Sequence, residues 1–138
     1  MNSIAKELKQ IISTGTQKHP LPQKMGNSIR IGSVVIRYSK TKQTYILFDC
    51  MKQEPLGTMN SKYSALAAAK AYAEEQSISH VQYLDMQYVK HTADIEVYEN
   101  ILNKSNDSFR KDLAEVRLGI SEAKLDNVLI QLEDIIFK

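Results

Sequence analysis

Apolar residues recur every seven positions between residues 80 and 104, in a stretch that contains no glycine and no proline. This period is typical of one long α-helix that packs along its whole length. The opposite side is apolar too, and a helix that is apolar on two sides usually lies between two partners. The two sets are Val81, Leu84, Tyr88, His91, Ile95, Tyr98 and Leu102 on one side, and Tyr83, Met86, Ala93, Val97 and Ile101 on the other.

A polar break at residues 104–107, with the sequence KSND, separates this helix from a second helical pattern that runs to about Phe137. Ser, Asn and Asp favour turns and helix caps in such a place. Two helices joined by so short a link usually pack antiparallel. We therefore expect a helical hairpin with arms about 40 Å long, from a rise of about 1.5 Å per residue.

The second helical pattern changes the side on which its apolar residues lie, close to Gly119. With about 100° of rotation per residue, the residues before the change share one face and those after it share the opposite face. The first set is Phe109, Leu113, Val116, Ile120 and Ala123, and the second is Leu118, Leu125, Leu129, Leu132 and Ile136.

Two structures explain this change of face. In one, the helix ends near Gly119 and restarts with Ser121 as its N-cap. In the other, the helix is continuous, and Gly119 costs about 1 kcal/mol relative to alanine. We favour the continuous helix, because residues 122–136 have a strong helical pattern. Its first half would pack on the preceding helix, and its second half on the N-terminal segment, the β-module or another subunit.

Residues 29–76 have the pattern of a three-stranded antiparallel β-meander followed by a helix. The strands are predicted at 29–39, 44–51 and 56–59, with a bulge or bend at Gly32-Ser33, where the apolar alternation changes phase. Either Asn60 or Ser61 would cap the alanine-rich helix, which is predicted to run to about Gln76.

The N-terminal 28 residues are predicted to form an arm. Ile4, Leu8, Ile11 and Ile12 make a short amphipathic helix, and residues 13–28 make a linker with two prolines and two glycines. The expected fold class is therefore α+β. Its parts are an N-terminal helix and linker arm (1–28), a β-β-β-α module (29–76) and a long helical hairpin (77–138).

Charge is distributed unevenly along the chain, although the net charge is only +2. Residues 1–76 contain 11 Lys or Arg against 5 Asp or Glu, whereas residues 77–138 contain 7 against 11. The two halves could bind each other, or the basic half could meet nucleic acid. A single cysteine and no long apolar run predict a cytosolic protein that does not enter a membrane.

No residue pattern indicates catalysis, a cofactor or a metal. His19, His80 and His91 lack ligand spacing, and His91 at a heptad position is expected to be a core-edge polar residue. Cys50 is expected to be a small buried side chain in a central strand rather than a nucleophile. We therefore predict a protein that is not an enzyme.

Nucleic-acid binding is the alternative function that the basic region suggests. Residues 24–62 contain Arg30, Arg37, Lys40 and Lys42 among their cations, and a three-stranded sheet fits a major groove. Tyr38 or Tyr45 could stack on bases. In element order alone, this region is similar to the plant AP2-type and phage-integrase arm-type DNA-binding modules.

Most of the chain, residues 27–72 and 109–137, resembles uncharacterised small proteins encoded by large tailed phages of marine bacteria. That resemblance implies a viral origin and a virion or accessory role in the host cytoplasm. Together with the doubly apolar helices, it favours a structural protein that assembles with itself or with a protein partner. The residues predicted to form the contacts are Ile4, Leu8, Ile11, Ile12, Leu125, Leu129, Leu132 and Ile136.

Overall fold

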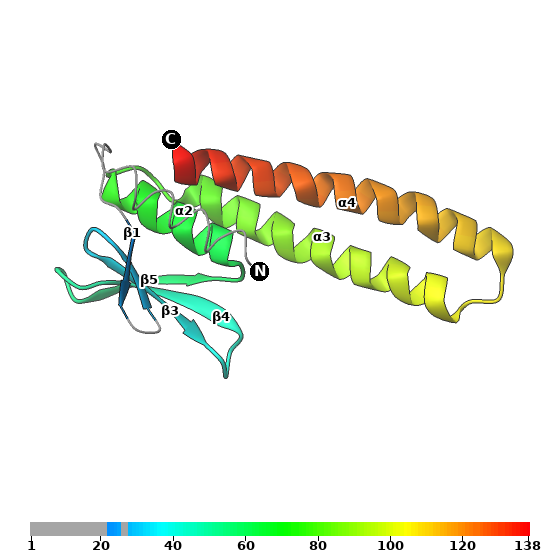
Figure 1. Ribbon diagram of the computed structural model, residues 1–138, viewed down its shortest axis with the longest axis horizontal. Helices are drawn as coiled ribbons and strands as arrows, with labels where there is room; N and C mark the ends of the chain where they lie inside the picture. The colour runs from blue at the N-terminus through cyan, green and yellow to red at the C-terminus, as the bar shows by residue number, and fades with distance from the viewer. Residues whose placement is uncertain (1–21, 26–27) are drawn as a thin grey trace.

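The computed structural model describes residues 22–25 and 28–138, which form an α+β fold (Figure 1). The α+β class is as predicted, while the predicted N-terminal helix lies outside the described residues. A five-stranded antiparallel sheet, with its strands in chain order, precedes three helices. The elements are β1 (Pro22–Met25), β2 (Ser28–Ile31), β3 (Val34–Ser39), β4 (Thr44–Asp49), β5 (Glu54–Met59), α2 (Lys62–Ala73), α3 (Ser79–Lys104) and α4 (Ser108–Phe137).

The strand predicted over residues 29–39 is in fact two strands joined by a tight turn. Ile31 pairs with Val34, so the loop between β2 and β3 contains only Gly32 and Ser33. Gly32 has a φ of +57°. The two-residue turns that suit the twist of a hairpin need a positive φ at this place, which glycine adopts without strain. The apolar alternation therefore changes phase at the turn of a β-hairpin and not at a bulge.

A further strand, β1, lies inside the segment that was predicted to be a linker. It pairs antiparallel with β2 and places Gln23 opposite Arg30. Its sequence, PQKM, has no apolar alternation, and it begins with the proline that edge strands tolerate at their first residue. The sheet therefore has two strands more than the predicted meander.

Alternation along the strands separates an inner face of the sheet from an outer one. Ile36 and Leu47 pair across β3 and β4, and both are buried. The neighbouring pair, Val35 and Phe48, points to the opposite side and is only partly covered. Helix α2 packs on the inner face and contacts β2, β3, β4 and β5 (Figure 1).

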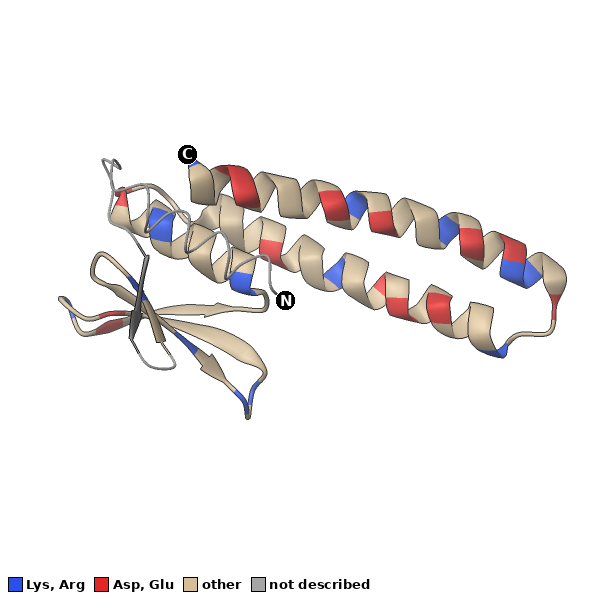
Figure 2. Ribbon diagram, in the orientation of Figure 1, with Lys and Arg blue, Asp and Glu red and all other residues tan. Residues whose placement is uncertain are grey.

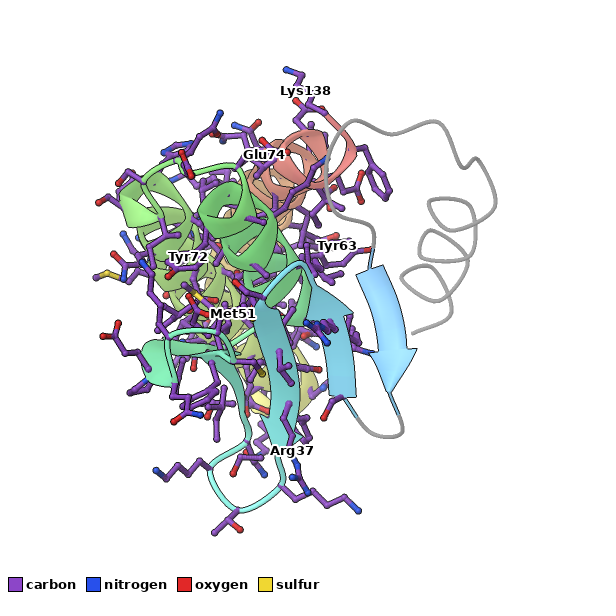
Figure 3. The ribbon with its side chains drawn as sticks, turned by 90° about the vertical axis from the view of Figure 1, so that its left-hand side faces the viewer. Arg37, Met51, Tyr63, Tyr72, Glu74 and Lys138 are labelled. Carbon is purple, nitrogen blue, oxygen red and sulfur yellow. The ribbon has the colours of Figure 1, made fainter. Side chains whose placement is uncertain are left out.

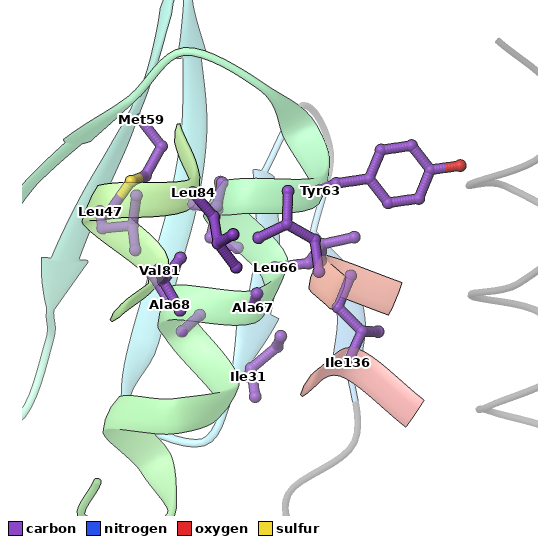
Figure 4. Close-up of a cluster of buried hydrophobic side chains, with 14 of the residues drawn as sticks. Ile31, Leu47, Met59, Tyr63, Leu66, Ala67, Ala68, Val81, Leu84 and Ile136 are labelled. Carbon is purple, nitrogen blue, oxygen red and sulfur yellow. The ribbon is translucent and has the colours of Figure 1, made fainter. Parts of the chain in front are cut away.

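Helix α2 is the middle layer of the molecule. Every residue from Tyr63 to Ala71 is buried, because the sheet lies on one side and the bases of α3 and α4 lie on the other. Alanine makes up much of this stretch and lets the layers approach closely. Figure 4 shows Leu47, Leu66, Leu84 and Ile136 converging in one core, which residues 29–76 and 77–138 share.

The start of α2 is capped as predicted. The Ser61 side chain accepts a hydrogen bond from the Ser64 backbone N–H at 2.9 Å. The helix ends at Ala73, which is earlier than the predicted Gln76.

Helices α3 and α4 form the predicted hairpin, and its far half extends beyond α2 and the sheet (Figure 1). Asp107 caps α4 by accepting hydrogen bonds from the backbone N–H groups of Phe109 and Arg110, at 3.0 and 3.3 Å. Helix α4 continues through Gly119, so the uninterrupted alternative is the correct one.

Two buried charged side chains fasten the hairpin to the rest of the fold. Both carboxylate oxygens of Asp85 on α3 accept from the backbone N–H of Asn60 at 3.0 Å, and Oδ2 also accepts from its side-chain amide at 2.9 Å. Lys70 on α2 donates to the backbone carbonyl of Ile136, in the last turn of α4. Burial lowers the pKa of Lys70. These bonds join α3 and α4 to the β5–α2 region.

Strand β4 ends at Asp49, two residues before the predicted end. The Asp49 carboxylate accepts from the Tyr72 hydroxyl and from the backbone N–H groups of Met51 and Lys52, which fold the chain into a turn. The Tyr72 hydroxyl in particular holds the pKa of Asp49 below its usual range. Cys50 consequently lies in the turn and is exposed, so the prediction of a buried cysteine is wrong.

Replacing Gly119 with alanine is expected to stabilise the protein by about 1 kcal/mol, because alanine loses less backbone entropy in a helix. A Cβ atom at this position would meet nothing within 4 Å. For a domain of this size the melting temperature should rise by about 3–5 °C, as measured by circular dichroism. A fall in melting temperature would contradict the open surroundings of this position.

Candidate functional site

The residues of α4 that pack on α3 form one stripe along the whole helix. This inner stripe consists of Ala114, Leu118, Ser121, Leu125, Val128, Leu132 and Ile136, which are buried or half-buried. Successive members are three or four residues apart, as in antiparallel bundles. The expectation that only the first half of α4 packs on α3 is therefore wrong, because both halves use the same face.

The apolar residues between Phe109 and Ile120 that were assigned to the hairpin contact instead face outward. Phe109 is 75% exposed, Leu113 40%, Val116 61% and Ile120 50%. The same face continues past Gly119 with Ala123, Ile130 and Phe137, which are also exposed. We call these seven residues the outer stripe. Exposed apolar strips of this kind are typical of contact surfaces.

Helix α3 also has an apolar side that other described residues leave uncovered. Its predicted second face includes Tyr83, Met86 and Val97, each more than half exposed. This face is interrupted by Lys90 and Asn100, so it is less continuous than the outer stripe of α4.

The contact residues predicted on α4 belong to the chain's own core. Leu132 is fully buried and Ile136 almost so, while Leu125 and Leu129 are half-buried. Their cover is α3 together with α2, which belongs to the predicted β-module. The predicted contact residues of the arm, Ile4, Leu8, Ile11 and Ile12, lie outside the described residues.

A basic hollow of about 870 Å³ lies at the end of the sheet formed by the β3–β4 turn. Arg37 and Lys40 line it, together with Lys62 from the start of α2, and no carboxylate is among its described lining residues. Figure 3 shows Arg37 on the side of the molecule away from the helices. Three cations around one hollow suit an anion such as a phosphate group.

The other two predicted nucleic-acid-binding residues lie outside this hollow. The Arg30 side chain is held by the β2–β3 turn, where its Nε donates to the Gly32 carbonyl at 2.8 Å. Lys42 lies on the β3–β4 turn, and its backbone N–H donates to Ser39 Oγ at 3.3 Å. Lys62 was missed as a site residue, because only the fold brings the start of α2 next to the turn.

Two tyrosines stand at the same hollow. The rings of Tyr38 and Tyr45 are 4.9 Å apart, with an angle of 52° between their planes. Burial, and to a lesser extent the neighbouring Tyr38 and Tyr88, raise the pKa of Tyr45. The Tyr45 phenol is therefore neutral at physiological pH and can face a ligand without adding negative charge.

His91 lies in the middle of the hairpin and is buried. Its Nδ1 has no hydrogen-bond partner among the described residues. Burial lowers its pKa, and Lys124 from α4 and Lys90 from α3 lower it further, against a smaller opposite effect of Asp94. The ring is therefore neutral in the folded protein at neutral pH.

The hairpin should lose stability as the pH falls below the ordinary histidine value of 6.5. The pKa of His91 is lowered by folding, so the unfolded chain binds the proton more readily and acid favours unfolding. We expect the urea midpoint to be highest above pH 6.5 and to fall below it. The variant His91→Gln should lose this dependence, and His80→Gln, at an exposed position, should keep it. An unchanged pH profile in His91→Gln would contradict the assignment.

Two other kinds of functional feature, metal sites and membrane-spanning helices, are not found among the described residues. No group of three or more His, Cys, Asp or Glu in residues 22–25 and 28–138 could hold a metal ion. None of the described helices combines the length and apolar character that a membrane span requires.

Comparison with known proteins does not indicate a function for this chain. The chain has no significant match among protein-family models, curated proteins or solved structures.

Proposed function

We propose that this chain is a non-enzymatic assembly protein that associates with a second copy through the outer stripe of α4. The single observation behind the proposal is the exposure of Phe109, Leu113, Val116 and Ile120 on a hairpin that extends beyond the body of the molecule. Burying each such side chain contributes about 1.5–3 kcal/mol relative to leaving it in water. A protein partner other than a second copy would use the same surface.

Sedimentation at micromolar concentrations tests this proposal. We expect a mass of twice 15.7 kDa for the natural chain and of a single chain for the double variant Val116→Glu, Ile120→Glu. Met51→Glu is the matched control, because it places the same charge on an exposed apolar residue far from the hairpin and should leave the dimer intact. A natural chain that stays monomeric over this range would rule out self-assembly.

Nucleic-acid binding is a second candidate function, supported by the basic hollow. Arg37, Lys40 and Lys62 converge there without a described carboxylate, beside the Tyr38 ring. Phosphate contacts of this kind dominate non-specific affinity for nucleic acids and weaken with salt.

A salt titration of binding to a short DNA duplex tests this second candidate. The double variant Arg37→Ala, Lys40→Ala should bind more weakly, and its salt slope should fall by about 0.9 for each phosphate contact that is lost. Lys104→Ala, at the hairpin tip, removes a lysine remote from the hollow and should change neither. No measurable binding at low salt would exclude this function.

A further inference from the structure

The outer stripe of α4 follows a strict heptad pattern. From Phe109 to Phe137, its positions alternate in steps of four and three residues, and Asn127 and Asp134 occupy the two places that are not apolar. In heptad terms, the a positions are Leu113, Ile120, Asn127 and Asp134, and the d positions are Phe109, Val116, Ala123, Ile130 and Phe137. Helix α4 thus has two stripes on roughly opposite sides, one that packs on α3 and one that is exposed among the described residues.

The charges beside the outer stripe are separated by sign. The e positions, which follow each d residue, contain no acidic residue, and the g positions, which precede each a residue, contain no basic one. The e positions are Arg110, Arg117, Lys124, Gln131 and Lys138, and the g positions are Asp112, Gly119, Asp126 and Glu133. All except Gln131 and Glu133 are exposed, so these charges are available to a partner. Figure 2 shows acidic and basic residues along the length of α4.

This separation distinguishes parallel from antiparallel pairing of two α4 helices. In a parallel pair, the e flank of one helix lies next to the g flank of the other, so bases meet acids. In an antiparallel pair, e lies next to e and g next to g, so like charges meet and oppose association. The charged flanks of two copies therefore match each other only in the parallel orientation.

Resting on the proposed function of self-assembly, we propose that two copies pair parallel and in register through their α4 helices, about a two-fold axis along the hairpin. Asp112 of one copy then lies beside Arg117 of the other, and Glu133 beside Lys138. Asn127 meets the same residue of the second copy, as polar residues at a positions do when they set register in two-stranded coiled coils.

The rest of the fold accommodates this pairing. Helix α4 lies along the edge of the molecule away from the sheet (Figure 1). The inner stripe keeps α3 on the other side of α4, so each copy would bring a complete hairpin to a four-helix assembly. A parallel pair places both hairpin tips at one end and both sheets at the other.

Disulfide trapping tests the orientation. In a Cys50→Ser background, Leu113→Cys at an a position and Ile130→Cys at a d position place one thiol each on either side of the centre of the stripe. In the parallel dimer each residue faces its twin, so each variant alone should form a covalent dimer after mild oxidation. In an antiparallel dimer each a position faces a d position of the other copy, so position 113 faces position 130 and only a mixture of the two variants would cross-link. Gln82→Cys, exposed on α3, is the control that should not cross-link.

Charge reversal tests the flanks. Arg117→Glu should raise the dimer dissociation constant about tenfold, because two symmetric contacts turn repulsive. Adding Asp112→Arg should restore most of the affinity in a parallel pair, whereas in an antiparallel pair Arg117→Glu alone should strengthen association, because it places an acid opposite the basic e flank of the other copy. The helix content of both variants, measured by circular dichroism, should stay as in the natural chain.

The outcomes separate this inference from the proposed function. A monomeric natural chain overturns both. A dimer that cross-links only in the mixture overturns parallel pairing alone. If the dimer cross-links neither in the single variants nor in their mixture, and if Arg117→Glu leaves its dissociation constant unchanged, the contact lies elsewhere, for example on α3. That result would also overturn this inference. Self-cross-linking of both variants with rescue by Asp112→Arg supports it.

Discussion

Replacing Leu132 with alanine is expected to lower the free energy of unfolding by about 3–5 kcal/mol. Leu132 has no exposed surface and belongs to the core that α2, α3 and α4 share. Removing its methyl groups loses their transfer energy and leaves a cavity. Because rigid layers border the site on more than one side, the surroundings cannot collapse fully into that cavity.

Urea denaturation monitored by circular dichroism measures this loss. Met86→Ala is the matched control, because it truncates a side chain of similar size that is 69% exposed on α3, and we expect a change below about 0.5 kcal/mol. Equal effects of the two substitutions would mean that the second half of α4 is not held against the body of the molecule.

The second large effect is expected from Asp85→Ala, at about 2–4 kcal/mol. The carboxylate is buried and accepts hydrogen bonds from the backbone and side chain of Asn60, 25 residues away in sequence. Alanine would leave these donors at the β5–α2 junction without their acceptor. It would also loosen the start of α3 from the sheet.

The same denaturation experiment measures the Asp85 effect. Glu96→Ala removes an exposed carboxylate from the same helix and should change stability by less than about 0.5 kcal/mol. A small effect of Asp85→Ala would show that its bonds to Asn60 contribute little to holding the hairpin base.

The helical hairpin could be predicted because its apolar periodicity extends over many residues and because the segment between the two helices is short and polar. Which apolar face of α4 is buried could not be predicted, because both faces satisfy helical periodicity. The inner stripe includes the small residues Ala114 and Ser121, which an apolar pattern hardly registers, although their size is what lets α3 approach. The opposite signs of the e and g flanks are the sequence signal that marks the free face.

The sheet was less predictable than the helices. Strand β1 is held in the sheet by its pairing with β2. Its own residues lack the apolar alternation from which a strand could be predicted. The turn at Gly32 could be read either as a bulge or as a reversal from alternation alone, and pairing of Ile31 with Val34 decides between them.

The candidate sites were predicted in part. Arg37 and Lys40 were identified from the basic composition of their region, and both line the hollow. Arg30 is held away from it by a local hydrogen bond to Gly32, and Lys62 joins it through tertiary folding. Long-range proximity of this kind has no signature in a single sequence.

The far half of the hairpin extends past the sheet and α2, which makes its length independent of the core (Figure 1). Seven extra residues in each arm, added at the tip near Ser105, would lengthen the hairpin by about 10 Å. Two turns of helix return the side chains almost to the same face, so both stripes would continue without a break. Relatives of this chain could therefore differ in reach while keeping the same folded body, with the hairpin acting as an adjustable spacer.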